Sequence, residues 1–282
     1  MTTSPVLTRD DVLLRAAPAS SGRTRQWLRQ NERPLLGAAT FALLLLVWEL
    51  SVRLGLARAL FVSSPSLLLN SLSQAIQRGT LWKDVGVSLE EYVLGFVSAA
   101  VLGIVAGIAV GWYRRLNHLA SPWLAAWYAV PHIALVPLII LWFGIGLPYK
   151  VFYVFMVSFF NVVMNTVVGV QSSEAQYLQV ARSFRASQLM IFRSVVLPGA
   201  LPYILTGLRQ ATGRAWVGVV VAELVGGNAG IGYMINVAGQ MLDTSRMMLG
   251  VVLLGLFGVV LGEVMRRVER RFEVWRPQRA DG

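Results

Sequence analysis

Long apolar runs without a charged residue constrain the fold of this chain most. Residues 92–113 and 116–149 contain no Asp, Glu, Lys or Arg. A helix of about 20 apolar residues crosses a hydrocarbon core of roughly 30 Å. Only 14% of the residues are charged, whereas soluble domains carry about a quarter. The sequence therefore predicts an all-α integral membrane protein.

Six membrane spans are expected from these runs. A turn at residues 144–148 ends the third span, and Pro131 and Pro137 are expected to kink that helix without ending it. The predicted spans are 35–54, 92–113, 121–143, 151–171, 201–225 and 247–265. Residues 55–83 are expected to form a segment outside the membrane with a short surface helix.

The spans divide the chain into a transmembrane domain and two polar tails. Residues 34–268 form the domain, residues 1–33 are expected to be a disordered tail, and residues 269–282 form a basic tail. Most Lys and Arg residues fall on one side if both termini are cytoplasmic, as the positive-inside rule requires. We therefore expect a multi-pass protein of the cell membrane with both ends in the cytoplasm.

Composition excludes several classes of function. The chain has no cysteine, which rules out disulfides and thiolate metal sites. Its net charge of +11 lies outside the apolar runs, so we expect contact with anionic lipid headgroups rather than with nucleic acid. Neither Lys83 nor Lys150 follows a glycine, which excludes a Walker A loop. With two histidines and no nucleophile elbow before a helix, we expect no catalytic site, no bound metal and no cofactor.

A long polar segment, residues 174–198, lies between the fourth and fifth spans. Its apolar residues recur at helical spacing up to Phe184, which predicts a short amphipathic helix. Ser187 is expected to cap a second short helix that ends near residue 196. Pro198 and Pro202 are expected to stop that helix and to restart the chain as the fifth span. The pattern alone fits either an interfacial anchor or a docking element.

This segment resembles the EAA loop of binding-protein-dependent ABC importer permeases. The family pattern is Glu-Ala-Ala, three residues, Gly, nine residues and Ile-x-Leu-Pro. In register here are residues 179–181, Arg185 and residues 195–198. The spacing matches throughout, but Gln179, Val180 and Arg185 stand where the family has Glu, Ala and Gly.

Four further stretches resemble the same family over most of residues 35–269. The first looks like the family's turn after the third span. The others look like the fifth span, and the loop after it, of the subgroup that imports nitrate, taurine and alkanesulfonates. The stretches are residues 142–146, 207–209 with 213–216, 221–223, and 230–235. The resemblance implies a type I (MetI-like) permease fold and a small solute, an anion such as nitrate, taurine or an alkanesulfonate. Related permeases also import riboflavin-like and thiamine-precursor solutes, so a neutral heteroaromatic solute is the alternative.

The resemblance also implies partners. They are a second permease copy, two cytoplasmic ATP-binding subunits that hold ATP and magnesium, and an extracytoplasmic solute-binding protein. In such importers the loop docks in a groove of the ATPase, with Phe184 as the expected apolar knob and with arginines as partners for acidic groove residues. Phe184 could instead dip into the lipid headgroups. The expected docking residues are Gln179, Val180, Ala181, Arg182, Phe184, Arg185, Leu197 and Pro198. The alternative function is a stand-alone secondary transporter or channel.

Polar residues inside the predicted spans are candidates for the solute pathway. Arg209 and Arg214 could draw an oxyanion through the membrane, because a guanidinium pairs with such groups in a fork. They could instead pair with Glu49, Glu223 or a partner subunit.

The remaining polar candidates also keep two interpretations. Asn161 and Asn165 share a helix face, so they could line the pathway or bond a neighbouring helix. Glu223 is a further pathway candidate near the outer end of the fifth span. His132 could relay a proton or be structural.

Overall fold

The computed structural model describes residues 32–172, 179–181 and 183–272 and divides the chain into two units, Met1–Arg58 and Ala59–Gly282. The described residues are helical or lie in turns between helices, and none forms a strand. Five helices are long and apolar enough to cross a membrane, and a bent helix pair provides up to one more. The prediction of an all-α fold with about six spans is therefore confirmed.

The described part of the first unit contains one long helix, α3 (Glu32–Arg53). Its 22 residues extend about 33 Å at 1.5 Å per residue, enough to cross a bilayer core. Glu49 pairs with Arg53 one turn later, with 2.6 Å between Oε1 and Nε. The charge at Glu49 is thus balanced within its own helix.

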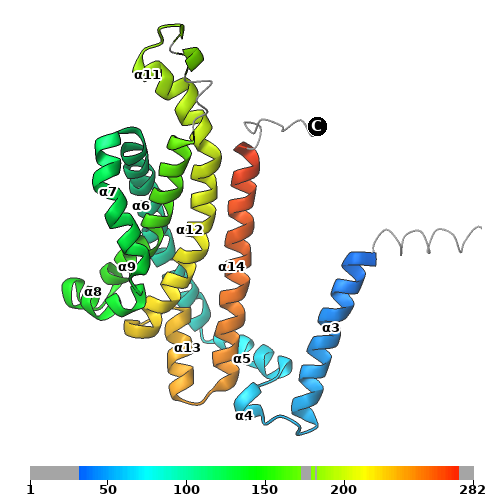
Figure 1. Cartoon of the computed structure of the whole chain (residues 1–282). Coiled ribbons are helices and arrows are strands. Elements are labelled where there is room, and N and C mark those ends of the chain that lie inside the picture. The colour runs from blue at the N-terminus through cyan, green and yellow to red at the C-terminus, as the bar shows by residue number, and fades with distance from the viewer. Residues whose placement is uncertain (1–31, 173–178, 182, 273–282) are drawn as a thin grey trace, which may run out of the picture. The chain divides into compact units, whose positions relative to one another are not determined.

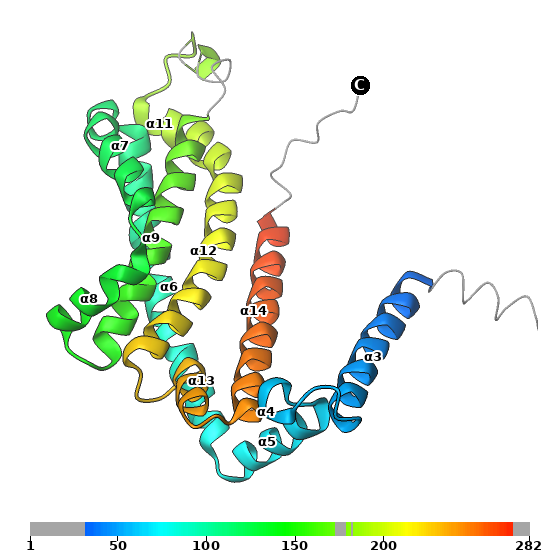
Figure 2. The ribbon, with the colours of Figure 1, turned by 60° about the horizontal axis from the view of Figure 1, so that its bottom comes forward.

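The second unit is a helical core in which α12 lies beside both α9 and α14 (Figure 1, Figure 2). The short helices α11 and α13 lie at opposite ends of α12. In chain order the helices are α4 (Ala59–Val62), α5 (Pro65–Gln77), α6 (Thr80–Trp112), α7 (Arg114–Ala129), the 3₁₀ turn η1 (His132–Leu135), α8 (Val136–Phe143), α9 (Leu147–Gln171), α11 (Gln188–Ile191), the π turn η2 (Phe192–Val196), α12 (Leu197–Gly226), α13 (Ile231–Gln240) and α14 (Thr244–Phe272).

A ladder of small residues packs α6 against α9. Gly95, Ala99, Gly103, Gly107 and Gly111 recur at every fourth position and so share one face of α6. A Cβ added to Gly95 would lie 2.6 Å from Cβ of Val154, and one added to Gly103 would lie 2.9 Å from Cβ of Val162. Small residues at this spacing let two membrane helices approach closely without a hydrophobic driving force between them.

The third span is broken, contrary to the prediction of a kinked but continuous helix. Helix α7 ends at Ala129, and the axis turns by 93° before α8. The ring of Pro131 disfavours helical backbone at Val130, which is extended (φ −79°, ψ 124°). Pro137 lies in the first turn of α8, where the missing N–H costs nothing. One proline therefore ends a helix and the other helps to start the next.

The prolines at the start of the fifth span do not stop the helix, which corrects a second prediction. Ser187 caps α11 as expected, since its Oγ accepts from the Met190 N–H at 3.3 Å. The helix then continues without a break from Gln188 to Gly226, over 39 residues. The π turn η2 ends two residues before Pro198 and widens the helix at the carbonyls that the proline ring approaches.

Candidate coupling and transport site

The segment between α9 and α11 contains a short helical turn with a defined end. Residues 179–181 and 183 are helical, whereas Arg182 and residues 174–178 lie outside the described residues. The N–H of Ala186 donates to the carbonyl of Ala181 at 3.1 Å, and Arg185 has a left-handed backbone (φ 52°). This is a Schellman ending, in which glycine is preferred because a Cβ is unfavourable there. The geometry explains why the EAA pattern has glycine at the position of Arg185.

This turn is anchored by two alanines and carries an exposed phenylalanine. Ala181 and Ala186 pack against a cluster that includes Val170 and Ile191. Phe184, in the same turn, is 83% exposed. Gln179, Val180, Leu197 and Pro198 lie near it in the chain, and the first three are exposed. An exposed phenylalanine on an anchored turn is suited to bind an apolar groove of another protein.

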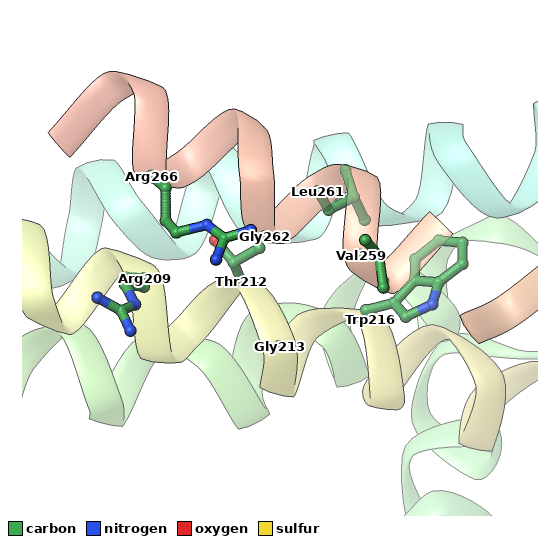
Figure 3. Close-up of a pocket in the computed structure, with 9 residues that line it drawn as sticks. Arg209, Thr212, Gly213, Trp216, Val259, Leu261, Gly262 and Arg266 are labelled. Atoms are coloured by element: carbon green, nitrogen blue, oxygen red, sulfur yellow. The ribbon is translucent and has the colours of Figure 1, made fainter. Parts of the chain in front are cut away.

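Arg209 lies on the side of α12 that faces α14. Its Nη1 is 3.4 Å from Oε2 of Glu269, so within the second unit it pairs with Glu269 and not with Glu223. It lines a groove of about 340 Å³ between α12 and α14, with Arg266 at the same end and Trp216 at the other (Figure 3). Because Glu269 follows the apolar run of α14, Arg209 is level with the end of that run.

Arg214 lies on a different side of α12 and contacts α7. Its Cζ is 5.9 Å from the ring centroid of Tyr128. It is five positions after Arg209, and at about 100° per residue the two side chains point about 140° apart around the helix axis. The structure thus places the two arginines in different surroundings, although the sequence suggested one role for both.

Both asparagines lie on α9, and Asn161 contacts Tyr128 of α7. The hydroxyl of Tyr128 donates to Oδ1 of Asn161 at 3.1 Å, and Nδ2 of Asn165 donates to the carbonyl of Asn161 at 2.9 Å. Asn161 is 2% exposed, and its Nδ2 has no partner among the described residues. Asn161 therefore bonds a neighbouring helix and still carries a donor that is not satisfied.

Glu223 is fully buried at the α13 end of the core. Its Oε1 accepts from the hydroxyl of Ser88 at 2.6 Å, and its Oε2 accepts from the N–H of Gly232 at 2.6 Å. Ser88 in turn accepts from the N–H of Ile231 at 3.0 Å, and Asp84 accepts from the N–H of Gly230 at 3.1 Å. These side chains satisfy the free N–H groups at the start of α13.

A buried ion pair lies beside this cluster and was missed by the sequence interpretation. Nζ of Lys150 is 2.6 Å from Oε1 of Glu91, and both side chains are at most 2% exposed. Lys150 also donates to the carbonyl of Ala229 at 3.4 Å. Asp84, Ser88 and Glu91 follow helical spacing, which was a usable signal. They fell between the expected outside segment, residues 55–83, and the expected second span, residues 92–113, and were given no role, whereas α6 begins at Thr80.

Comparisons with known proteins agree with this architecture. The chain is 34% identical over 235 residues to the putative aliphatic sulfonates transport permease protein SsuC of Bacillus subtilis, covering 83% of this chain and 85% of that protein. It is 34% identical over 245 residues to the taurine transport system permease protein TauC of Escherichia coli, covering 85% and 89%. It is 33% identical over 249 residues to the riboflavin transport system permease protein RibX of Chloroflexus aurantiacus, covering 88% and 93%.

Solved structures show the same fold. An inward-facing MetNI methionine ABC transporter chain aligns with a TM-score of 0.59 at 17% identity, over 67% of this chain and 94% of that one. Residues 99–274 match the family described as binding-protein-dependent transport system inner membrane component. The chain therefore belongs to the family of binding-protein-dependent ABC importer permeases.

Proposed function

We propose that this chain forms the membrane half of an ATP-driven importer for a small anionic solute of the taurine or alkanesulfonate type. The solute class is supported by the similarity of this chain to SsuC and TauC, which are named for the transport of aliphatic sulfonates and of taurine. The observation that carries the mechanism is the exposed Phe184 on an anchored helical turn. Two copies of the chain work with two ATPase subunits, which hold the ATP and magnesium, and a solute-binding protein delivers the solute.

The long helix from Gln188 to Gly226 is suited to carry motion from the ATPase into the membrane. Its 39 residues extend about 58 Å, and it starts directly after the turn that bears Phe184. Its other end bears Glu223, which holds the start of α13. Movement of the turn by an ATPase is then transmitted as a rigid-body shift to the opposite membrane surface.

The distribution of arginine supports a cytoplasmic position for the α11 end and for the end of α14, and we propose the same side for the N-terminus. Trp112, at the end of α6, contacts Phe192 with ring centroids 5.1 Å apart, so Arg114 lies at this end. The pair of Arg209 with Glu269 brings the end of α14 to the same side. Clustering of arginine at one end is typical of a cytoplasmic surface.

The exposed face of α12 is suited to line the pathway between two copies. Gln210, Gly213 and Arg214 are exposed on this face, whereas Arg209 faces α14. Arginine at the bilayer centre costs about 2.5–3.5 kcal/mol, so such a face is expected to meet water or another subunit rather than lipid. We therefore place Arg214, with Asn161 and Asn165 behind it, along the pathway, and Glu223 acts on the pathway through α13.

The test is solute uptake by the chain reconstituted in vesicles with its ATPase and binding protein. Phe184→Ala is expected to lose the ATPase on purification and to abolish uptake of taurine, because the apolar knob is removed. Phe61→Ala is the matched control, since Phe61 is also exposed (71%) but lies in α4. Full uptake by the Phe184 variant, or uptake by the chain alone driven by an ion gradient, would favour a stand-alone transporter.

A further inference from the structure

A chain of contacts joins three helices around Arg214. The guanidinium lies over the ring of Tyr128, at 5.9 Å from its centroid. The hydroxyl of the same ring donates to Asn161 at 3.1 Å. The ring is therefore held in place by α9 while it supports a cation from α12. We call Arg214, Tyr128 and Asn161 the Arg214 shelf.

The charge of Arg214 is not neutralised by a carboxylate among the described residues. Arg209 pairs with Glu269, and Arg266 pairs with Glu263 at 2.6 Å, but Arg214 forms no such pair. Glu223 accepts from Ser88 and Gly232 instead. Arg214 is also exposed, as is nearly half of Tyr128. A ligand that carries an oxyanion can therefore reach this guanidinium.

Two nitrogen atoms near the shelf lack partners among the described residues. They are Nδ2 of Asn161 and Nε2 of His132, and both are buried. His132 lies in the break after α7, four residues beyond Tyr128. Buried polar atoms are rarely left without a hydrogen bond, so each can take a water molecule or another polar group as its partner.

The shelf lies at membrane depth. Nε1 of Trp216 donates to the carbonyl of Leu254 at 2.9 Å, near the middle of the apolar run of α14. Arg214 is two residues away in α12, or about 3 Å along the axis. A solute that crosses the membrane beside the exposed face of α12 therefore passes the guanidinium midway.

We propose that the Arg214 shelf binds the sulfonate group of the solute during translocation, an assignment that rests on the proposed function. A guanidinium offers two parallel N–H groups to two sulfonate oxygens. The buried Asn161 amide does not reach the solute, but it holds the Tyr128 ring on which the guanidinium rests. Arg214 contacts the solute, whereas Asn161 acts as a positioning residue that orients the Tyr128 ring.

The first test measures binding without turnover. The purified wild-type importer is treated with phenylglyoxal, which modifies arginine, in the presence of ethanesulfonate or of ethyl methyl sulfone, an uncharged analogue. Ethanesulfonate is expected to slow modification of Arg214 several-fold, and the sulfone is not. Arg266, which is also exposed but paired with Glu263, is the internal control and is expected to react at an unchanged rate. The proposal is overturned if ethanesulfonate leaves the rate of Arg214 modification unchanged both in the presence and in the absence of bound nucleotide.

The second test measures transport in the reconstituted importer. Arg214→Gln is expected to reduce taurine uptake at least tenfold, which corresponds to about 1.4 kcal/mol. Arg214→Lys is expected to be intermediate, because it keeps the charge and loses the fork. Tyr128→Phe keeps the ring, loses the bond to Asn161 and is expected to raise KM more than it lowers kcat. Arg266→Gln is the control. Wild-type uptake by Arg214→Gln would refute the shelf alone, whereas no ATP-driven uptake by the wild type would refute the proposed function.

Discussion

Replacing Lys150 with methionine is expected to destabilise the core by about 3–5 kcal/mol, because a buried charge is then left without its partner. Nζ of Lys150 is 2.6 Å from Oε1 of Glu91, and at most 2% of either side chain is exposed. Solvent therefore cannot screen the charge that remains on Glu91. The substitution also removes the donor to the Ala229 carbonyl, in the loop that leads into α13.

The double variant separates the charge effect from the loss of packing. Glu91→Leu combined with Lys150→Met is expected to recover most of the lost stability, since an apolar pair of similar volume often replaces a buried ion pair without cost. The free energy of unfolding is measured by titrating the purified chain in mild detergent with SDS and following tryptophan fluorescence. This cycle reports the coupling between the two side chains.

A matched ion pair on α3 provides the control. Arg53 is also 2.6 Å from its partner, Glu49, but its side chain is 68% exposed. Arg53→Met is therefore expected to cost only about 0–1 kcal/mol. The reasoning is refuted if Lys150→Met costs no more than this control, or if the double variant is less stable than Lys150→Met alone.

Three further predictions follow from the backbone. Gly103→Leu is expected to destabilise the chain by at least about 1–3 kcal/mol in the same titration, because its side chain would overlap α9, whereas Gly86→Leu on the same helix meets open space and is expected to have little effect. Arg185→Gly is expected to stabilise the coupling turn by about 1 kcal/mol by relieving its left-handed backbone, measured as slower amide hydrogen exchange at residues 184–186. Gly230→Ala is expected to loosen α13, because φ is 114° and a Cβ would collide with Glu223; limited proteolysis after residue 226 is expected to accelerate, with Gly199→Ala as the unaffected control.

The existence of the long apolar helices followed from the sequence because crossing a bilayer is a property of consecutive residues. Apolar runs of sufficient length predicted the helices that became α3, α6, α9, α12 and α14. Ser187 was identified as a helix cap for the same reason, since a cap bonds residues only a turn away. The family pattern around Arg185 was recognised from its fixed spacing. The structure explains why glycine is usual at that position, since the backbone there is left-handed.

The local effect of proline was judged wrongly at two places. Pro131 ended a helix that was expected to continue, and Pro198 did not stop a helix that was expected to end. The outcome depends on whether the preceding turn of backbone can widen to avoid the proline ring and to tolerate the lost hydrogen bond. Before Pro198 a π turn makes room for the ring and for the missing hydrogen bond. The composition of residues 192–196 did not predict that turn.

Only the tertiary structure decided which polar side chains meet. Lys150 and Glu91 lie 59 positions apart, and Arg209 and Arg214 have different neighbours although they lie five residues apart on one helix. The rotation of each helix about its axis settles such pairs, and that rotation depends on how small-residue faces such as the α6 ladder fit their partners. Hydropathy determines that a helix lies in the membrane, but it is nearly the same on every side of an apolar helix. It therefore leaves open which side meets protein and which meets the pathway, and close packing resolves this.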